Sequence, residues 1–192
     1  MYKNMKKIVL IAAAAFGALT CFAQPKFAHV NMTELVQLMP EMDQARTAMN
    51  ASSKEAQDTY QAMVEEFNSK YSQYQQKAST WTPVIRESKE KELGEIQQRI
   101  QEFQESVQAE LQQQQQQLMA PIQKKAQETV SNIAKAAGYI YVFDISTILY
   151  LDPAQSTDIT AEARKALGIP EDRTLESLQA ELQAQAQAQK QE

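Results

Sequence analysis

The sequence has few of the residues on which many catalytic and ligand-binding sites depend. Its 192 residues include one cysteine, one histidine and four glycines. The glycines are too scattered for a loop that cradles phosphates, and neither a GxSxG nor an HExxH pattern is present. The histidine, His29, stands in a strand-like segment, where we expect a structural role. The composition argues against an enzyme, and we expect no cofactor and no metal.

The chain also lacks a hydrophobic run long enough to cross a membrane. The apolar run from Ile8 to Leu19 is shorter than the roughly 20 residues that a spanning helix needs. Three lysines precede this run and Cys21-Phe22-Ala23 follows it, a pattern typical of a secretory signal peptide. We predict that residues 1–23 are a signal peptide and that the mature protein is exported and soluble. The alternative is a lipidated Cys21.

Positive charge is scarce in the part of the chain expected to mature. Losing the three lysines of the first 23 residues changes the formal net charge from −5 to −8, which argues against a nucleic-acid partner. Residues 67–91 nevertheless carry an excess of three positive charges. We predict that this segment contacts an acidic partner or an anionic membrane surface; the alternative is that its charges only solubilise the chain. The basic residues are Lys70, Lys77, Arg86, Lys89 and Lys91.

Two long segments carry apolar or small side chains at every third or fourth position. They run from Met42 to Ile85 and from Leu93 to Ala137, and only a helix satisfies this spacing. Between them Thr82 can cap a helix and Pro83 can take its first position. We therefore predict one antiparallel helical hairpin, an arm over residues 41–137 with its tip near residues 79–88.

Two residues of the second predicted helix weaken it. Gly94 has low helix propensity, and Pro121 cannot donate a backbone hydrogen bond to the preceding turn. We expect the arm to bend at these two positions.

Strand-like segments flank the hairpin. One is Lys26 to Met32 and the other is Tyr139 to Leu151, so strands formed by them can pair at the root of the arm. These strands are too few to enclose a core, and their open edges favour association with further copies. The predicted fold is α+β and mostly α, with a β-rich body over residues 24–40 and 138–170 that assembles into a barrel-like centre. Candidate oligomerisation residues are Phe27, Val30, Ile140, Val142, Ile148 and Tyr150.

The first helix of the arm and its tip carry apolar side chains that could bind a partner. Either they fill the seam between the two helices, or a two-helix arm is too thin to bury them all and some stay open. The candidates are Tyr60, Met63, Val64, Phe67, Tyr71, Tyr74, Trp81, Val84 and Ile85. Residues 171–192 form a Gln/Ala-rich tail with a weak helix start at Thr174, and we expect disorder there.

The segments KFAHVNMTELVQLMPE, GYIYVFDISTILYLDP and DITAEARKAL, with a Gln-, Glu- and Lys-rich hairpin between the first two, resemble the Skp/OmpH family of periplasmic chaperones. The resemblance covers Lys26 to Leu167. Its specific positions are Gly138, Asp144, Tyr150 and the triplet that starts at Asp158. The acidic charge departs from the strongly basic members of the family, which weakens any expectation of lipopolysaccharide binding.

The resemblance implies a homotrimer with a central β body and three helical arms around a cavity. Members of the family hold unfolded outer-membrane proteins there without ATP until delivery to the outer-membrane assembly machinery. We therefore predict an ATP-independent holdase chaperone whose partners are unfolded outer-membrane β-barrel proteins and further copies of itself. The competing hypotheses are a structural coiled-coil spacer of the cell envelope and an adaptor subunit, neither of which would bind unfolded clients.

Overall fold

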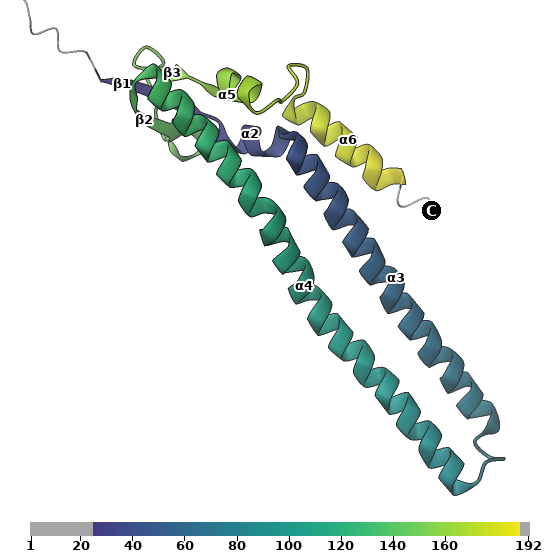
Figure 1. Ribbon diagram of the computed structural model, residues 1–192. Coiled ribbons are helices and arrows are strands. Elements are labelled where there is room, and N and C mark those ends of the chain that lie inside the picture. Colours follow the sequence, from purple (N-terminus) through teal and green to yellow (C-terminus); the bar gives the residue numbers. More distant parts are fainter. Residues whose placement is uncertain (1–24, 189–192) are drawn as a thin grey trace, which may run out of the picture.

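A long helical hairpin projects from a small body made of a three-stranded sheet and short helices (Figure 1). This computed structural model describes residues 25–188. The elements in chain order are β1 (Lys26–Val30), α2 (Met32–Leu38), α3 (Pro40–Lys77), α4 (Pro83–Ala137), β2 (Tyr139–Asp144), the 3-10 turn η1 (Ile145–Thr147), β3 (Ser156–Asp158), α5 (Thr160–Ala166) and α6 (Leu175–Ala188). The predicted fold class, a mostly helical chain with an arm on a small β body, is confirmed. The signal peptide predicted for residues 1–23 lies outside the described residues.

Local capping sets the limits of α4. Its first residue is Pro83, and the Thr82 side chain accepts a hydrogen bond from the amide of Ile85, as the sequence predicts. At the other end Gly138 adopts the left-handed conformation, φ 73°, which favours glycine because a Cβ is disfavoured there. Between these ends α4 continues as one helix through Gly94 and Pro121.

The sheet is parallel and has β1 at its centre, in the order β2-β1-β3. Phe27 of β1 pairs with Tyr141 of β2. Because β1 precedes the arm and β2 follows it, this pairing joins the two roots of the arm within one chain. His29 has a structural role: it is buried, and its Nδ1 lies 2.9 Å from the Ser156 hydroxyl of β3.

The strand-like segment predicted from Tyr139 to Leu151 is a strand only over its first six residues. β2 ends at Asp144 rather than near Leu151, because the Asp144 side chain accepts from the Ser146 amide at 3.1 Å and starts the turn η1. The expectation that Ile148 and Tyr150 stand in a strand is therefore wrong: both lie in the connection to β3.

The core lies where the root of the arm meets the body. Leu35, Leu38 and Met39, at the end of α2, are completely buried there. The α4 side chains that complete the cluster are Ile122, Ala126, Val130 and Ile133, and those of the C-terminal part are Ile159, Ala163, Leu167, Ile169 and Leu178. Farther out, Ile96 is the one buried apolar side chain of the arm among the described residues. The arm is thus well packed at its root and thinly packed beyond it.

The C-terminal tail differs from the prediction. Residues Leu175–Ala188 form α6, so the helix start predicted at Thr174 is present, but the disorder expected after it is not found up to Ala188. Thr174 and Ser177 cap this helix reciprocally, each amide donating to the other residue's hydroxyl at 3.0 Å. Leu178 is only 4% exposed and belongs to the core cluster. The prediction of disorder is wrong because it rests on the low hydrophobicity of the tail as a whole. One buried leucine and two capping side chains stabilise a short helix, and composition does not show their contribution.

Candidate functional site

The sheet has one face packed on the core and one that the chain leaves largely open. Ala28 of β1 is buried, and Val142, which pairs with it, packs against the core cluster. The alternating positions hold His29, which is buried beside β3, and the aromatic side chains Phe27, Tyr141 and Phe143, which we call the aromatic row. The Phe27 and Tyr141 ring centroids are 6.3 Å apart, and those of Tyr141 and Phe143 are 6.0 Å apart. Tyr141 is 60% exposed, so the row has no full cover in the single chain.

The connection from β2 to β3 adds further apolar surface to the body. Ile145 is exposed, Tyr150 is largely exposed, and Leu149 is completely exposed. In addition, β2 is an edge strand whose outer side pairs with no other strand of the described residues. Exposed apolar groups and an open strand edge in the same region are typical of a surface that associates with another chain.

The six predicted oligomerisation residues differ in how exposed the structure leaves them. Phe27 belongs to the aromatic row, and Ile140 and Tyr150 are exposed. Val30 is buried in the core of its own chain at 2% exposure and is not available to a partner, which corrects its assignment. Val142 packs against the same core, and Ile148 is half-buried.

Sequence reasoning missed three exposed residues of the body. Tyr141, Phe143 and Leu149 were not candidates, although each is more exposed than Val142. The run YIYVF of β2 is apolar at every position, so alternation does not distinguish its two faces. The register with β1, in which Tyr141 lies opposite Phe27, is the observation that does.

The nine candidate residues of the arm are divided between the seam and the surface. Tyr60, Tyr71, Val84 and Ile85 are exposed, and Val84 is 76% exposed. The other five are half-buried. Stacking covers some rings in part: the centroids of Phe67 and Tyr71 are 5.8 Å apart, and those of Tyr74 and Trp81 are 6.0 Å apart. None of the nine is buried, so the arm keeps apolar surface open along its outer half.

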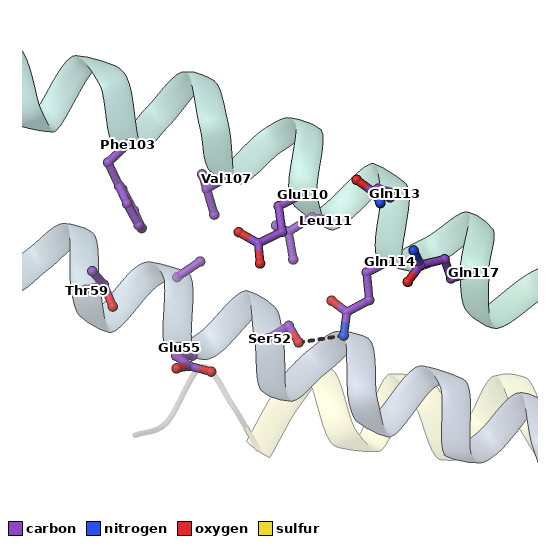
Figure 2. A pocket seen from close by; sticks show the side chains of 11 residues that line it. Ser52, Glu55, Thr59, Phe103, Val107, Glu110, Leu111, Gln113, Gln114 and Gln117 are labelled. Atoms are coloured by element: carbon purple, nitrogen blue, oxygen red, sulfur yellow. Dashed lines mark hydrogen bonds between the residues drawn. The ribbon is translucent and has the colours of Figure 1, made fainter.

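The two arm helices are parted in the middle by a cavity of about 640 Å³ (Figure 2). Small or polar side chains of α3, among them Ser52 and Thr59, face it, while Phe103, Val107 and Leu111 of α4 point toward it. One hydrogen bond of 2.9 Å crosses it, from Gln114 Nε2 to the Ser52 hydroxyl. The apolar stripe of α4 therefore remains partly uncovered here.

A second concave surface lies at the root of the arm. It is a groove of about 980 Å³ beside β2, and Met32, Val36, Met119, Val130 and Ile140 are among the residues that line it. Methionine side chains are flexible and polarizable, and they suit contacts with apolar segments of varied shape.

The basic tip is more strongly neutralised than the sequence suggests. Lys70 and Lys89 both pair with Glu92, and Lys91 lies 3.8 Å from Glu95. Hydrogen bonds from the two lysines lower the pKa of Glu92 to about 2, so this carboxylate stays charged at all but strongly acidic pH. Counting both glutamates reduces the local excess of positive charge from three to one.

Two of the five predicted tip cations have other surroundings. Arg86 Nε donates to the carbonyl of Ala78 at 3.3 Å and thereby caps the end of α3. Lys77 stands exposed in the last turn of α3. These are the tip cations best placed to meet an acidic surface.

Comparison with known proteins identifies the family. The family model described as "Outer membrane protein (OmpH-like)" matches residues 26–167. A crystal structure of an OmpH-like protein from Caulobacter crescentus CB15, described as a candidate outer membrane chaperone, matches with a TM-score of 0.67 and 13% identity over 74% of this chain and 83% of that one. At this identity the likeness shows a shared fold. No curated protein sequence matches the chain.

The family match spans the parts described above: β1, the whole arm, the aromatic row and α5. It stops short of α6. Within residues 25–188, none of the helices combines the length and hydrophobicity needed to span a bilayer. The OmpH-like proteins are periplasmic chaperones and not a family of enzymes. The chain belongs to the OmpH-like family of outer-membrane protein chaperones.

Proposed function

We propose that the protein is an ATP-independent holdase that encloses unfolded outer-membrane β-barrel proteins between its helical arms and prevents their aggregation. In this proposal three copies join through their bodies, a number that rests on the family resemblance, and their arms surround a shared cavity. The chain acts in the periplasm after loss of residues 1–23, and the N-terminal sequence of the protein purified from its source cells tests that step.

The observation that carries the proposal is apolar surface left open on the arm. A coiled-coil spacer needs its apolar stripe only to hold its own helices together, and it gains nothing from exposed tyrosines. Here Tyr60, Tyr71, Val84 and Ile85 are exposed, and the mid-arm cavity leaves the stripe of α4 partly uncovered. Surface of this kind can contact apolar segments of many sequences.

Weak contacts suffice for holding if many act at once. A client inside the cavity meets several arms at a high effective concentration, so contacts of a fraction of a kcal/mol each combine into stable retention. Release needs no ATP, because a client that folds in the membrane buries the groups that the arms had touched, and mass action empties the cavity.

The first test measures aggregation of a denatured outer-membrane β-barrel protein. The unaltered protein should suppress aggregation at about one assembly per client, with no effect of added ATP. Replacing the four exposed arm residues Tyr60, Tyr71, Val84 and Ile85 by serine should weaken client binding roughly tenfold, because the lost apolar contacts together contribute on the order of 1.4 kcal/mol.

A matched control replaces four exposed polar residues of the same arm by serine: Gln57, Asn68, Gln73 and Gln97. This control should leave client binding unchanged. If the unaltered protein leaves the aggregation of such clients unaffected, the spacer or adaptor hypothesis stands and the holdase proposal is wrong.

Arm flexibility should set the range of clients that fit. We propose Gly94 and Pro121 as the bending positions. Gly94 has open space around it, and Pro121 supplies no backbone donor within α4. Replacing both by alanine should stiffen the arm and narrow the distribution of shapes in small-angle scattering. An unchanged distribution would rule out this pair as the hinge.

The tip supports only a weak contact with an anionic membrane surface. We propose that Lys77 and Arg86 make it, each contributing roughly 1 kcal/mol near such a surface. Replacing both by glutamine should lower binding to vesicles rich in anionic lipid roughly tenfold or more. Replacing Lys70 and Lys91 instead removes the same charge from cations that already face carboxylates. Equal losses in the two variants would show that the net charge of the tip governs binding, and not Lys77 and Arg86 in particular.

A further inference from the structure

The first helix of the arm meets the body through a joint of one residue. α2 ends at Leu38 and α3 begins at Pro40, and Met39 between them is extended, with φ −60° and ψ 139°. Pro40 has no backbone N–H, so helical hydrogen bonding does not run through the joint. The angle between the body and α3 therefore depends on contacts that bridge this joint.

An arginine of α5 holds the start of the C-terminal segment beside α2. The Arg164 guanidinium pairs with the Glu34 carboxylate of α2. It also donates to the carbonyl of Pro170 at 2.9 Å and to that of Arg173. Both side chains of the ion pair are mostly buried, and charge-assisted hydrogen bonds in such surroundings are the stronger kind.

A second arginine reaches past the joint to the arm. Arg173 Nη2 donates to Asp43 Oδ1, on the first turn of α3, at 2.6 Å. The same carboxylate oxygen accepts from Arg46 at 3.0 Å, and Arg46 donates in turn to the carbonyl of Gln37 near the end of α2, also at 3.0 Å. Asp43 is thus the shared acceptor on the arm side of the joint.

Helix α6 adds an apolar contact on the body side. It lies against α2 (Figure 1), and Leu178 is buried in the same cluster as Leu35 and Leu38. One turn farther along α6, Leu182 is 40% exposed. The C-terminal segment therefore contacts α2 through Leu178 and α3 through Arg173, and Arg164 of α5 holds the start of this segment beside α2.

We propose that residues 169–188 act as a strut across the Met39 joint and set the angle at which the arm leaves the body. Arg164, Arg173 and Leu178 are its positioning residues. α6 lies beyond the residues that the family model matches, so the family match does not account for the strut. A fixed arm angle would give the cavity between the arms a defined width for clients, and this consequence rests on the proposed function. The strut itself does not depend on that function.

Hydrogen exchange of the full chain without client tests the strut. Arg173→Gln and Leu178→Ser should each accelerate exchange at the joint amides of Met39 and Met42, which donate to the carbonyls of Leu35 and Met39, by roughly tenfold. Deletion of residues 171–192 should accelerate exchange at these two amides by at least the same factor. The matched controls are Leu182→Ser, at an exposed position one turn beyond Leu178, and Arg99→Gln, whose partner Glu66 lies within the arm. Both controls should leave joint exchange unchanged.

Two outcomes would overturn the strut. One is an unchanged rate of hydrogen exchange at the Met39 and Met42 amides in the deletion variant, which would show that α6 does not stabilise the joint. The other is an equal acceleration throughout β1 and α5, which would make the segment a general stabiliser of the body. Failure of the proposed function would appear elsewhere, as aggregation of clients in the presence of the unaltered protein, whatever the exchange shows.

Discussion

Replacing both Tyr141 and Phe143 by serine is expected to convert the assembly into folded single chains. Both rings lie on the open face of the sheet and are exposed in one chain, Tyr141 to 60% and Phe143 to 43%, so their loss should cost little in folding. At an interface each would bury roughly 100 Å² more, about 2 kcal/mol per ring. The double variant should weaken association roughly a thousandfold, which light scattering measures as a fall in mass at micromolar concentration.

The control for this prediction is a pair of exposed tyrosines of the arm, Tyr60 and Tyr71, which lie outside the body. Replacing Tyr60 and Tyr71 by serine should leave the mass unchanged, because neither belongs to the proposed interface. Circular dichroism should show the helical content of the unaltered protein in both variants. If the Tyr141/Phe143 variant keeps the mass of the unaltered assembly, the aromatic row is not the oligomerisation surface.

The second large effect is expected on stability. Leu38 is completely buried at the end of α2, in the cluster that joins the body to the arm. Leu38→Ala removes apolar contacts and leaves a cavity, and such changes lower the free energy of unfolding by about 2 to 5 kcal/mol. Urea denaturation followed by circular dichroism measures the loss. Because Leu38 lies one residue before the joint, the body and the arm root should unfold together.

A solvent-exposed aliphatic residue provides the comparison. Val84→Ala, at the tip, should change the free energy of unfolding by no more than about 0.5 kcal/mol, since Val84 is already largely exposed. If Leu38→Ala lowered the free energy of unfolding by less than about 1 kcal/mol, the close-packed root would be contradicted, because replacing a buried leucine by alanine in such a core costs more than that.

The sequence predicts the arm and its ends because these depend on local chemistry. A spacing of three and four residues specifies a helix whatever its surroundings, and the turn is specified by Thr82 and Pro83 and the C-cap by Gly138, all read from residue type. The pairing of β1 with β2 follows from topology, since the arm starts and ends at one place. These are the features that the structure confirms.

The features that the sequence does not predict depend on contacts distant in the chain. Which of Tyr141 and Val142 faces the core is decided by register against β1. The order in α6 depends on Leu178 reaching α2 and Arg173 reaching Asp43, 130 residues earlier in the chain. The charge of the tip depends on Lys70 meeting Glu92 across the two helices. None of these partners is adjacent in sequence, so composition alone suggested a disordered tail and a basic tip.

The most direct test of enclosure is neutron scattering of the complex between the protein and a deuterated, unfolded outer-membrane β-barrel protein. Contrast is chosen so that only the client scatters. The proposed function predicts a compact client whose radius of gyration is smaller than that of the surrounding assembly, with the two centres of mass nearly coincident in a contrast series. A client more extended than the assembly, or one whose centre of mass lies outside the arms, would contradict it.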